Sequence, residues 1–302
     1  MKPSKEIEIN LLENESFFQN EFFDRFKLRY AQHPLLLTKT ISKNYLFPTF
    51  YGDTVCAMAI FLCSFEKAAA LMPHSTIRPI SMLGGRSLVV ISCYEYKQVF
   101  NIPPYNEIAF NIPVIIRPSW NVPVLPMIAG NLFSHFGYFC FAMPVTSLEN
   151  KIRGEKIWGL PKSVNEVNFN HSEKNCQVSA FDEDGSAFLE LNIPKGGKPT
   201  HFDTQATLFS IKNGELIGSR THFNGHFKVI KNMSLLLGIG KTPAAPPIKL
   251  EVSPSARTLL DLEIDPRPFQ FRFCPSMSAC FDLPHVNYSP HSQIELNPTS
   301  NF

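Results

Sequence analysis

Apolar and polar positions alternate along most of the chain, which is the pattern of half-buried β-strands. Three stretches are especially rich in β-branched and aromatic residues, namely RSLVVISCYEY at 86–96, NEIAFNIPVII at 106–116 and FGYFCFAMPV at 136–145. We expect further strands in 164–171, 176–193, 208–220, 222–230, 267–275 and 278–283. The pairs Asp184-Gly185, Asn213-Gly214 and Asn224-Gly225 are typical of hairpin turns.

Helical periodicity is limited to short segments. Residues 14–32 repeat Phe18, Phe22 and Phe26 every four positions, which predicts an amphipathic helix. Shorter helices are expected at 64–72, where Ser64 is a plausible N-cap, at 127–136 and at 254–262.

Together these elements predict a β-rich α+β protein. We expect a mostly antiparallel, barrel-like sheet around a central cavity, with a few flanking helices. Residues 1–45 are interpreted as an N-terminal helical arm, 46–288 as the main domain, and 289–302 as a polar C-terminal tail.

Composition narrows the functional classes. Hydrophobic residues make up 44% of the 302-residue chain, enough for a sizeable core, and the net charge is only +2 with scattered basic residues. We therefore expect no nucleic-acid surface. The first residues lack the apolar segment of a signal peptide, and the longest apolar run, 55–63, is too short to span a bilayer. The seven cysteines have irregular spacing, so we expect reduced thiols and a cytoplasmic protein.

Two motifs suggestive of nucleotide or metal binding are weak. LLLGIGKT at 235–242 has Leu235 where a phosphate-binding loop needs glycine. His222 and His226 are spaced like metal ligands on a helix, but a strand or hairpin would not bring them together. We expect neither a metal nor a cofactor.

Two segments are placed for catalysis. Lys162 stands in an apolar stretch, IWGLPKSV at 157–164, and Glu107 begins an apolar strand after a Pro-Pro-Tyr-Asn turn. A lysine amine that is buried among apolar groups loses its charge more readily, and the neutral amine attacks a carbonyl to form an imine. The protonated imine withdraws electrons from a neighbouring bond, and a carboxylate nearby can shuttle protons. Taken singly, both residues are also compatible with ordinary surface positions.

The stretch MPVTSLENKIRGEKIWGLPKSVNEVNF, 143–169, resembles the signature region of the acetoacetate decarboxylase family. PYNEIAFNIPV at 104–114 resembles that family's Tyr-x-Glu strand, and SFEKAAALMP at 64–73 its early helix. Order and spacing agree over about residues 46–285. The resemblance implies a barrel-like cavity, a homo-oligomer, a small-molecule carbonyl substrate and no membrane or nucleic-acid partner.

The resemblance also implies site residues. Lys162 matches the Schiff-base lysine and Glu107 the glutamate beside it, so we expect both to be catalytic. Tyr105, Trp158 and Pro161 are expected to shape the substrate pocket. Arg117, just beyond the strand, is a weaker candidate for binding a substrate carboxylate.

The chain departs from the family pattern around the lysine. Ser163 replaces the second lysine that follows the nucleophile, and Gly154-Glu155-Lys156 replaces the usual Gly-Arg-Glu. Activation of Lys162 must then come from burial or from a cation such as Lys156 or Arg153. The expected activity is that of a Schiff-base-forming, decarboxylase-like lyase acting on a β-keto or oxo acid. An aldolase or dehydratase acting on an oxo acid, and a non-catalytic binder of an apolar small molecule, are the alternatives.

Overall fold

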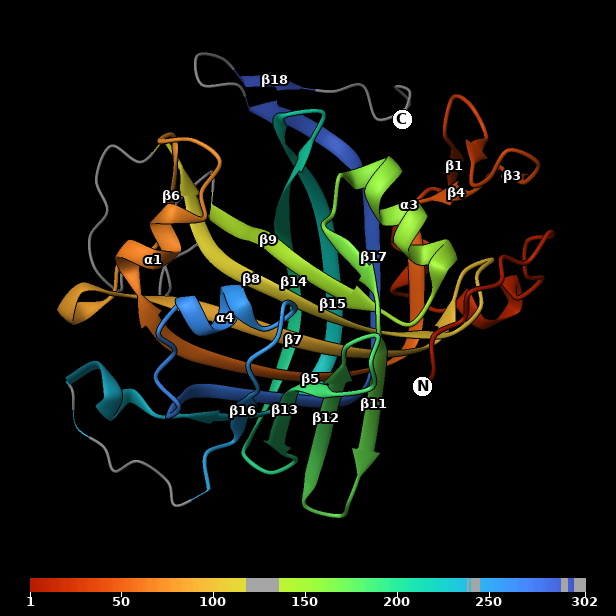
Figure 1. Cartoon of the computed structure of the whole chain (residues 1–302). Helices are drawn as coiled ribbons and strands as arrows, with labels where there is room; N and C mark the ends of the chain where they lie inside the picture. Colours follow the sequence, from red (N-terminus) through yellow and green to blue (C-terminus); the bar gives the residue numbers. More distant parts are fainter. Residues whose placement is uncertain (118–135, 238, 240–244, 289–292, 296–302) are drawn as a thin grey trace.

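The computed structural model describes residues 1–117, 136–237, 239, 245–288 and 293–295. Its centre is a closed barrel of seven strands in the order β9-β14-β15-β17-β5-β7-β8, which closes because β8 also pairs with β9 (Figure 1). Neighbours in the barrel are antiparallel except β14 and β9, which run parallel. The predicted fold class is confirmed. The barrel strands are β5 (Thr49–Ser64), β7 (Arg86–Val99), β8 (Tyr105–Ile116), β9 (Phe136–Val145), β14 (Lys198–Lys212), β15 (Glu215–Lys231) and β17 (Pro268–Tyr288).

A second antiparallel sheet covers one side of the barrel (Figure 1). It consists of β11 (Glu166–His171), β12 (Asn175–Phe181), β13 (Ala187–Pro194) and β16 (Ile248–Leu250). Between the two sheets lies a large apolar core, to which β8 contributes Ile108, Phe110 and Ile112. The alternate residues of β8 face the barrel interior, so every position of this strand is buried.

Two of the three predicted hairpin turns are confirmed. Asn213-Gly214 joins β14 to β15 with φ of 53° and 82°, and Asp184-Gly185 lies between β12 and β13. The third prediction is wrong, because Asn224-Gly225 lies inside β15 next to a register shift. Glycine is needed there for close approach, since a Cβ on Gly225 would lie 2.8 Å from the Cβ of Met277.

The helix predicted over 14–32 is wrong. The segment instead forms two short 3-10 helices, η1 (Glu15–Phe18) and η2 (Phe23–Arg25). Phe18, Phe22 and Phe23 pack together against Phe50 and Phe100 of the main domain. This aromatic packing outweighs the local preference of the segment for a helix. The N-terminal segment therefore packs on the barrel, and its strand β1 pairs with β4.

Two of the shorter helices agree with the sequence. α1 (Phe65–Ala70) begins after Ser64, whose hydroxyl accepts a hydrogen bond from the Lys67 amide, and α4 (Arg257–Asp261) lies within the predicted 254–262. The helix expected at 127–136 lies outside the described residues except for Phe136, which begins β9. The remaining elements are β1 (Arg29–Tyr30), β2 (Leu35–Leu36), β3 (Ser42–Lys43), β4 (Leu46–Phe47), β6 (Ile77–Pro79), η3 (Leu83–Gly85), η5 (Met233–Leu237) and β18 (Gln293–Glu295).

The sequence did not predict the helix that matters most for the site, α3 (Leu148–Trp158). The Ser147 hydroxyl caps its start by accepting a hydrogen bond from the Asn150 amide, and Gly159 ends it with a left-handed φ of 59°. α3 connects β9 to the short strand β10 (Lys162–Val164), which pairs parallel to β9. This β9-α3-β10 unit positions the lysine.

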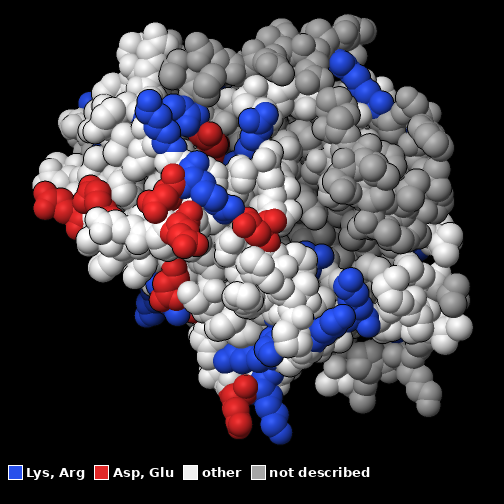
Figure 2. Space-filling model, turned by 180° about the vertical axis from the view of Figure 1, so that it is seen from behind, with Lys and Arg blue, Asp and Glu red and all other residues white. Residues whose placement is uncertain are grey.

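In Figure 2, acidic and basic side chains lie next to one another on the upper left of the described surface, and basic side chains predominate in its lower part. None of the described helices has the length and apolar character required to cross a membrane.

Candidate active site

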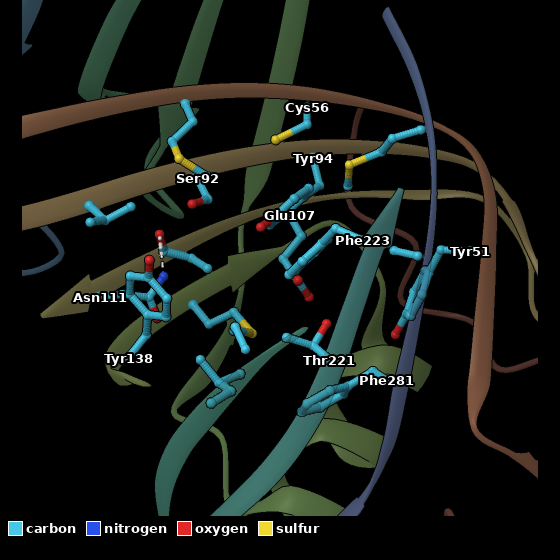
Figure 3. A pocket seen from close by; sticks show the side chains of 18 of the residues that line it. Tyr51, Cys56, Ser92, Tyr94, Glu107, Asn111, Tyr138, Thr221, Phe223 and Phe281 are labelled. Carbon is cyan, nitrogen blue, oxygen red and sulfur yellow. Dashed lines mark hydrogen bonds between the residues drawn. The ribbon is translucent and has the colours of Figure 1, made fainter. Parts of the chain in front are cut away.

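Lys162 and Glu107 meet inside the barrel. The Lys162 Nζ donates a hydrogen bond to Glu107 Oε2 over 2.6 Å, although the two residues are 55 positions apart in the sequence. The side chains are only 6% and 7% exposed, so the pair is shielded from water. Glu107 points into the cavity from β8 (Figure 3), and Lys162 reaches it from the first residue of β10.

Helix α3 packs directly on the lysine side chain. A Cβ added to Gly154 would lie 2.4 Å from Lys162 Cδ and 2.6 Å from Cε. Only glycine therefore leaves room for the lysine to extend along this turn of the helix toward Glu107.

Tyrosines surround the glutamate. The Tyr96 hydroxyl donates to Glu107 Oε1 over 3.2 Å, and the Tyr96 ring lies 4.6 Å from that of Tyr51 and 4.8 Å from that of Tyr105. Burial, and then the negative charge of Glu107, raise the pKa of Tyr96 well above its usual value. Burial likewise raises the pKa of Tyr51 to about 12. These phenols are neutral at physiological pH and act as hydrogen-bond donors.

Arg153 of α3 lines the same cavity and is 1% exposed. Its two terminal nitrogens donate to Asn150 Oδ1 and Thr49 Oγ1, at 3.0 and 3.1 Å, and its Nε has no hydrogen-bond partner among the described residues. Both of its partners are neutral. No carboxylate of the described residues forms an ion pair with this guanidinium.

One carboxylate on the same helix could neutralise Arg153, but it is already paired with a lysine. Glu149 accepts hydrogen bonds from Lys43 Nζ on both oxygens, at 3.0 and 2.9 Å, and from the Tyr45 hydroxyl at 2.6 Å. Behind the cavity wall lies a balanced buried pair, Lys43–Glu149, whereas Arg153, which lines the cavity, has no counter-ion among the described residues. Because an uncompensated buried charge is costly, this guanidinium favours an anion in the cavity.

Lys162, Glu107, Tyr51, Tyr96 and Arg153 line one cavity of about 440 Å³, in which apolar and aromatic side chains dominate. Figure 3 shows Glu107 near its middle, Tyr51 and Phe281 on one side and Asn111 and Tyr138 on the other. Thr204 and Gln205 of β14 line it and are exposed, so the cavity opens to solvent beside them.

The structure brings together most of the predicted site residues. Lys162, Glu107 and Trp158 line the cavity, and the Tyr105 ring centroid lies 5.7 Å from Lys162 Nζ. The other two lie elsewhere: Pro161 and Arg117 are exposed and are not among the lining residues.

Of the two cations considered for lysine activation, only Arg153 reaches the cavity. The Lys156 ammonium donates instead to the Leu36 carbonyl at 2.6 Å, on the exposed side of α3. The sequence indicated Arg153 only as a cation near the lysine, and it missed Tyr96 as a lining residue and Gly154 as the residue that packs on Lys162. A helix prediction for 148–158, from the Ser147 cap and the terminal Gly159, would have placed Arg153 and Gly154 together on one turn.

A cysteine nucleophile and a metal site find no support among the described residues. Burial raises the pKa of Cys56, which lines the cavity, so its thiol is protonated and a poor nucleophile. His222 and His226 both lie on β15, and the described part of the chain contains no group of three or more His, Cys, Asp or Glu side chains able to hold a metal ion.

Residues 32–217 match the family model described as acetoacetate decarboxylase. This chain belongs to the acetoacetate decarboxylase family. Both Glu107 and Lys162 fall within the matched residues. A search of curated proteins found no match.

Several solved structures, among them acetoacetate decarboxylases, have a similar fold. The acetoacetate decarboxylase of Legionella pneumophila has a TM-score of 0.55 and 11% identity, over 78% of this chain and 86% of that one. Another acetoacetate decarboxylase structure has a TM-score of 0.52 and 11% identity, over 78% of this chain and 87% of that one. The enduracididine biosynthesis enzyme MppR, complexed with pyruvate, has a TM-score of 0.52 and 8% identity, over 81% and 92%. At these identities the likeness concerns the fold alone.

Proposed function

We propose that this member of the family is a Schiff-base-forming lyase that acts on an oxo acid through an imine on Lys162. The observation that carries the proposal is the 2.6 Å contact between Lys162 Nζ and Glu107 Oε2 in a largely apolar cavity. An amine and a carboxylate at this distance can exchange a proton directly.

The first steps follow from that contact. The Lys162 ammonium gives a proton to Glu107, and the neutral amine adds to the substrate ketone to form a carbinolamine. Glu107 returns the proton to the carbinolamine hydroxyl, which leaves as water and produces a protonated imine. Tyr96, which donates to the other Glu107 oxygen, holds the carboxylate in place through this exchange.

The protonated imine then accepts an electron pair from the adjacent carbon–carbon bond. With a β-keto acid, carbon dioxide leaves and the pair forms an enamine. Glu107 is again a carboxylate at this stage, so the proton added to the enamine carbon comes from water. The hydroxide left behind attacks the resulting protonated imine and releases the ketone and the neutral lysine amine, which takes up a proton from solvent. This sequence consumes no oxidant and needs no cofactor.

Arg153 is the group we assign to the substrate carboxylate. Its charge has no counter-ion among the described residues, and its two hydrogen-bond acceptors, Asn150 Oδ1 and Thr49 Oγ1, are neutral, so a substrate anion could serve as its partner. A guanidinium forms strong, charge-assisted hydrogen bonds with a carboxylate.

The same arginine supports a second candidate reaction. In a decarboxylation, Arg153 would stabilise the substrate carboxylate more before carbon dioxide departs than afterwards. Stabilising the ground state in this way does not accelerate the loss of carbon dioxide. An aldolase or dehydratase that keeps the carboxylate would use Arg153 without this disadvantage. The Lys162 imine serves either reaction.

Reductive trapping tests the proposal. The protein is incubated with separate β-keto and 2-oxo acids, borohydride is added, and any adduct is located by peptide mass spectrometry. We expect a stable adduct on Lys162 and none in the Lys162→Arg variant, which keeps the positive charge beside Glu107.

The mass of the adduct distinguishes a decarboxylase from an aldolase or dehydratase. A β-keto acid adduct that has lost carbon dioxide supports the decarboxylase, and an adduct of a 2-oxo acid that retains its carboxylate supports the aldolase or dehydratase. If no acid in the panel modifies Lys162, the catalytic proposal fails, and the cavity would act as a binding site without turnover.

A further inference from the structure

The cavity extends well beyond the lysine and the glutamate. Side chains alternate along a strand, so β8 presents Glu107, Ala109 and Asn111 on one face, and all three line the cavity. Asn111 is four residues past Glu107, a distance of roughly 13 Å at the rise of a β-strand. Figure 3 shows Asn111 on the opposite side of Glu107 from Tyr51.

The walls of this extension are mainly apolar, although Ser92 and Arg272, each level with Met58, also line the cavity. Ile60 of β5 and Val90 of β7 pair with each other, Val90 pairs with Asn111, and all three line the cavity. Met58 lines it one layer nearer the lysine, at the level of Ala109. Alanine at 109 leaves the passage between Glu107 and Asn111 open.

The far end carries an unused hydrogen-bond acceptor. Asn111 is 5% exposed, and its Nδ2 donates to the Ala109 carbonyl over 3.3 Å. Its Oδ1 is buried and has no hydrogen-bond partner among the described residues. A buried acceptor left in this state costs free energy that a donor on a ligand would recover.

The opposite end carries the buried cation. Arg153 bonds to Thr49, which precedes Tyr51 on β5, whereas Asn111 lies level with Ile60 at the other end of that strand. The cavity thus has Arg153 at one end, the Lys162–Glu107 pair in its middle and a long, mainly apolar arm that ends in a hydrogen-bond acceptor. Its volume of about 440 Å³ suits a ligand much larger than acetoacetate.

We propose that the substrate is an oxo acid with an extended apolar tail. The carboxylate lies at Arg153, the ketone at Lys162, and the tail runs past Ala109 to Asn111, where a terminal hydroxyl donates to Oδ1. An extended chain advances roughly 1.2 Å per bond, so the arm accommodates a tail of about six to ten atoms. This assignment of the substrate class rests on the proposed function.

Binding of unreactive acids tests the arm independently of imine chemistry. Butanoate, hexanoate, octanoate and decanoate lack a ketone and are titrated calorimetrically into the full chain. Affinity should rise roughly threefold to fourfold per methylene until the tail reaches the Asn111 layer, because each methylene leaves water. An affinity that does not increase from butanoate to decanoate overturns the proposal.

Three variants locate the tail. Ala109→Leu should reduce decanoate affinity to the level of butanoate and leave butanoate unchanged. Hydroxylation of decanoate at its terminal carbon should improve binding roughly threefold to tenfold in the native protein, and Asn111→Leu should abolish that gain while keeping decanoate binding. Thr221→Val, which removes a hydroxyl elsewhere on the cavity wall, is the matched control and should leave the gain intact.

The outcomes separate the two proposals. Length-dependent binding without any borohydride adduct on Lys162 supports the arm and overturns the catalysis. An adduct on Lys162 with no dependence on tail length supports the catalysis and overturns the arm. A hydroxyl gain that survives Asn111→Leu overturns the role of Asn111.

Discussion

Gly154 of α3 lies directly against the aliphatic chain of Lys162, so closely that a Cβ on the glycine would lie 2.4 Å from Lys162 Cδ. The helix therefore serves as a wall that directs the lysine toward Glu107. The same turn carries Arg153, so one helical segment positions both the Lys162 side chain and a nearby positive charge.

Gly154→Ala should displace the Lys162 amine from Glu107 while the protein stays folded. Misplacing a reacting group by about 1 Å can cost roughly a hundredfold in rate, so we expect trapping by borohydride to slow by a factor of about ten to one hundred. Helix propensity favours alanine, which limits any loss of thermal stability. Gly196→Ala, where the added methyl meets open space, is the matched control. Equal trapping rates in the two variants would contradict the assigned role of Gly154.

Glu107→Gln should lower the rate of imine formation by roughly a hundredfold or more, because the amide cannot take the proton from Lys162. The measurement is single-turnover trapping at saturating substrate. Glu95→Gln provides the control, since Glu95 pairs with His171 outside the lining of the cavity. An unchanged rate in Glu107→Gln would mean that another group moves the proton.

Arg153→Met should weaken binding of the substrate carboxylate roughly tenfold to a hundredfold, because it removes a charge-assisted contact. The same change should raise the melting temperature, since it removes a buried charge without a counter-ion. Binding of decanoate and thermal unfolding measure the two effects. The combination of weaker binding and greater stability distinguishes a ligand-binding arginine from one that only supports the fold.

Lys43→Met is the informative contrast for Arg153. It leaves Glu149 buried without its ammonium, and we expect it to destabilise the fold by about 3–5 kcal/mol. A melting temperature that falls in Arg153→Met as it does in Lys43→Met would show that Arg153 already has its counter-ion within the chain.

Acid should destabilise the protein through His285. Burial, and then Arg220, lower the pKa of His285 to about 4 from its usual 6.5. The unfolded chain then binds more protons than the folded one between these values, so the free energy of unfolding falls as the pH drops from about 6.5 to about 4. Because the ring is partly solvated, we expect a contribution of about 1–2 kcal/mol.

Urea unfolding across this pH range checks the prediction for His285. The His285→Gln variant should lose part of the pH dependence, and His33→Gln, at an exposed position, should keep it. An identical slope in the native protein and in His285→Gln would contradict the assignment.

Local pattern was sufficient for much of the fold. Alternation predicted the barrel strands around 86–96, 106–116 and 136–145, and Asn213-Gly214 predicted the hairpin between β14 and β15. These features depend on neighbours close in sequence: a strand has a period of two, and a tight turn needs residues that accept positive φ. The family motifs also selected Lys162 and Glu107.

The predictions from sequence were wrong where contacts between residues distant in the sequence compete with the local pattern. The phenylalanines of 14–32 have helical spacing, but they pack on Phe50 and Phe100 and the helix does not form. Asn224-Gly225 has the composition of a turn, but its neighbours continue the ladder with β17. In both cases tertiary packing outweighs a preference of a few residues.

The sequence by itself determined a β-rich barrel and the lysine and glutamate of its candidate site. Only the tertiary structure decided that they meet at 2.6 Å, that Gly154 makes room for the lysine, and that Lys43 occupies Glu149 and leaves Arg153 without a counter-ion. The physical reason is that charge balance and cavity shape depend on groups 55 to 106 residues apart, which come together only when the barrel closes.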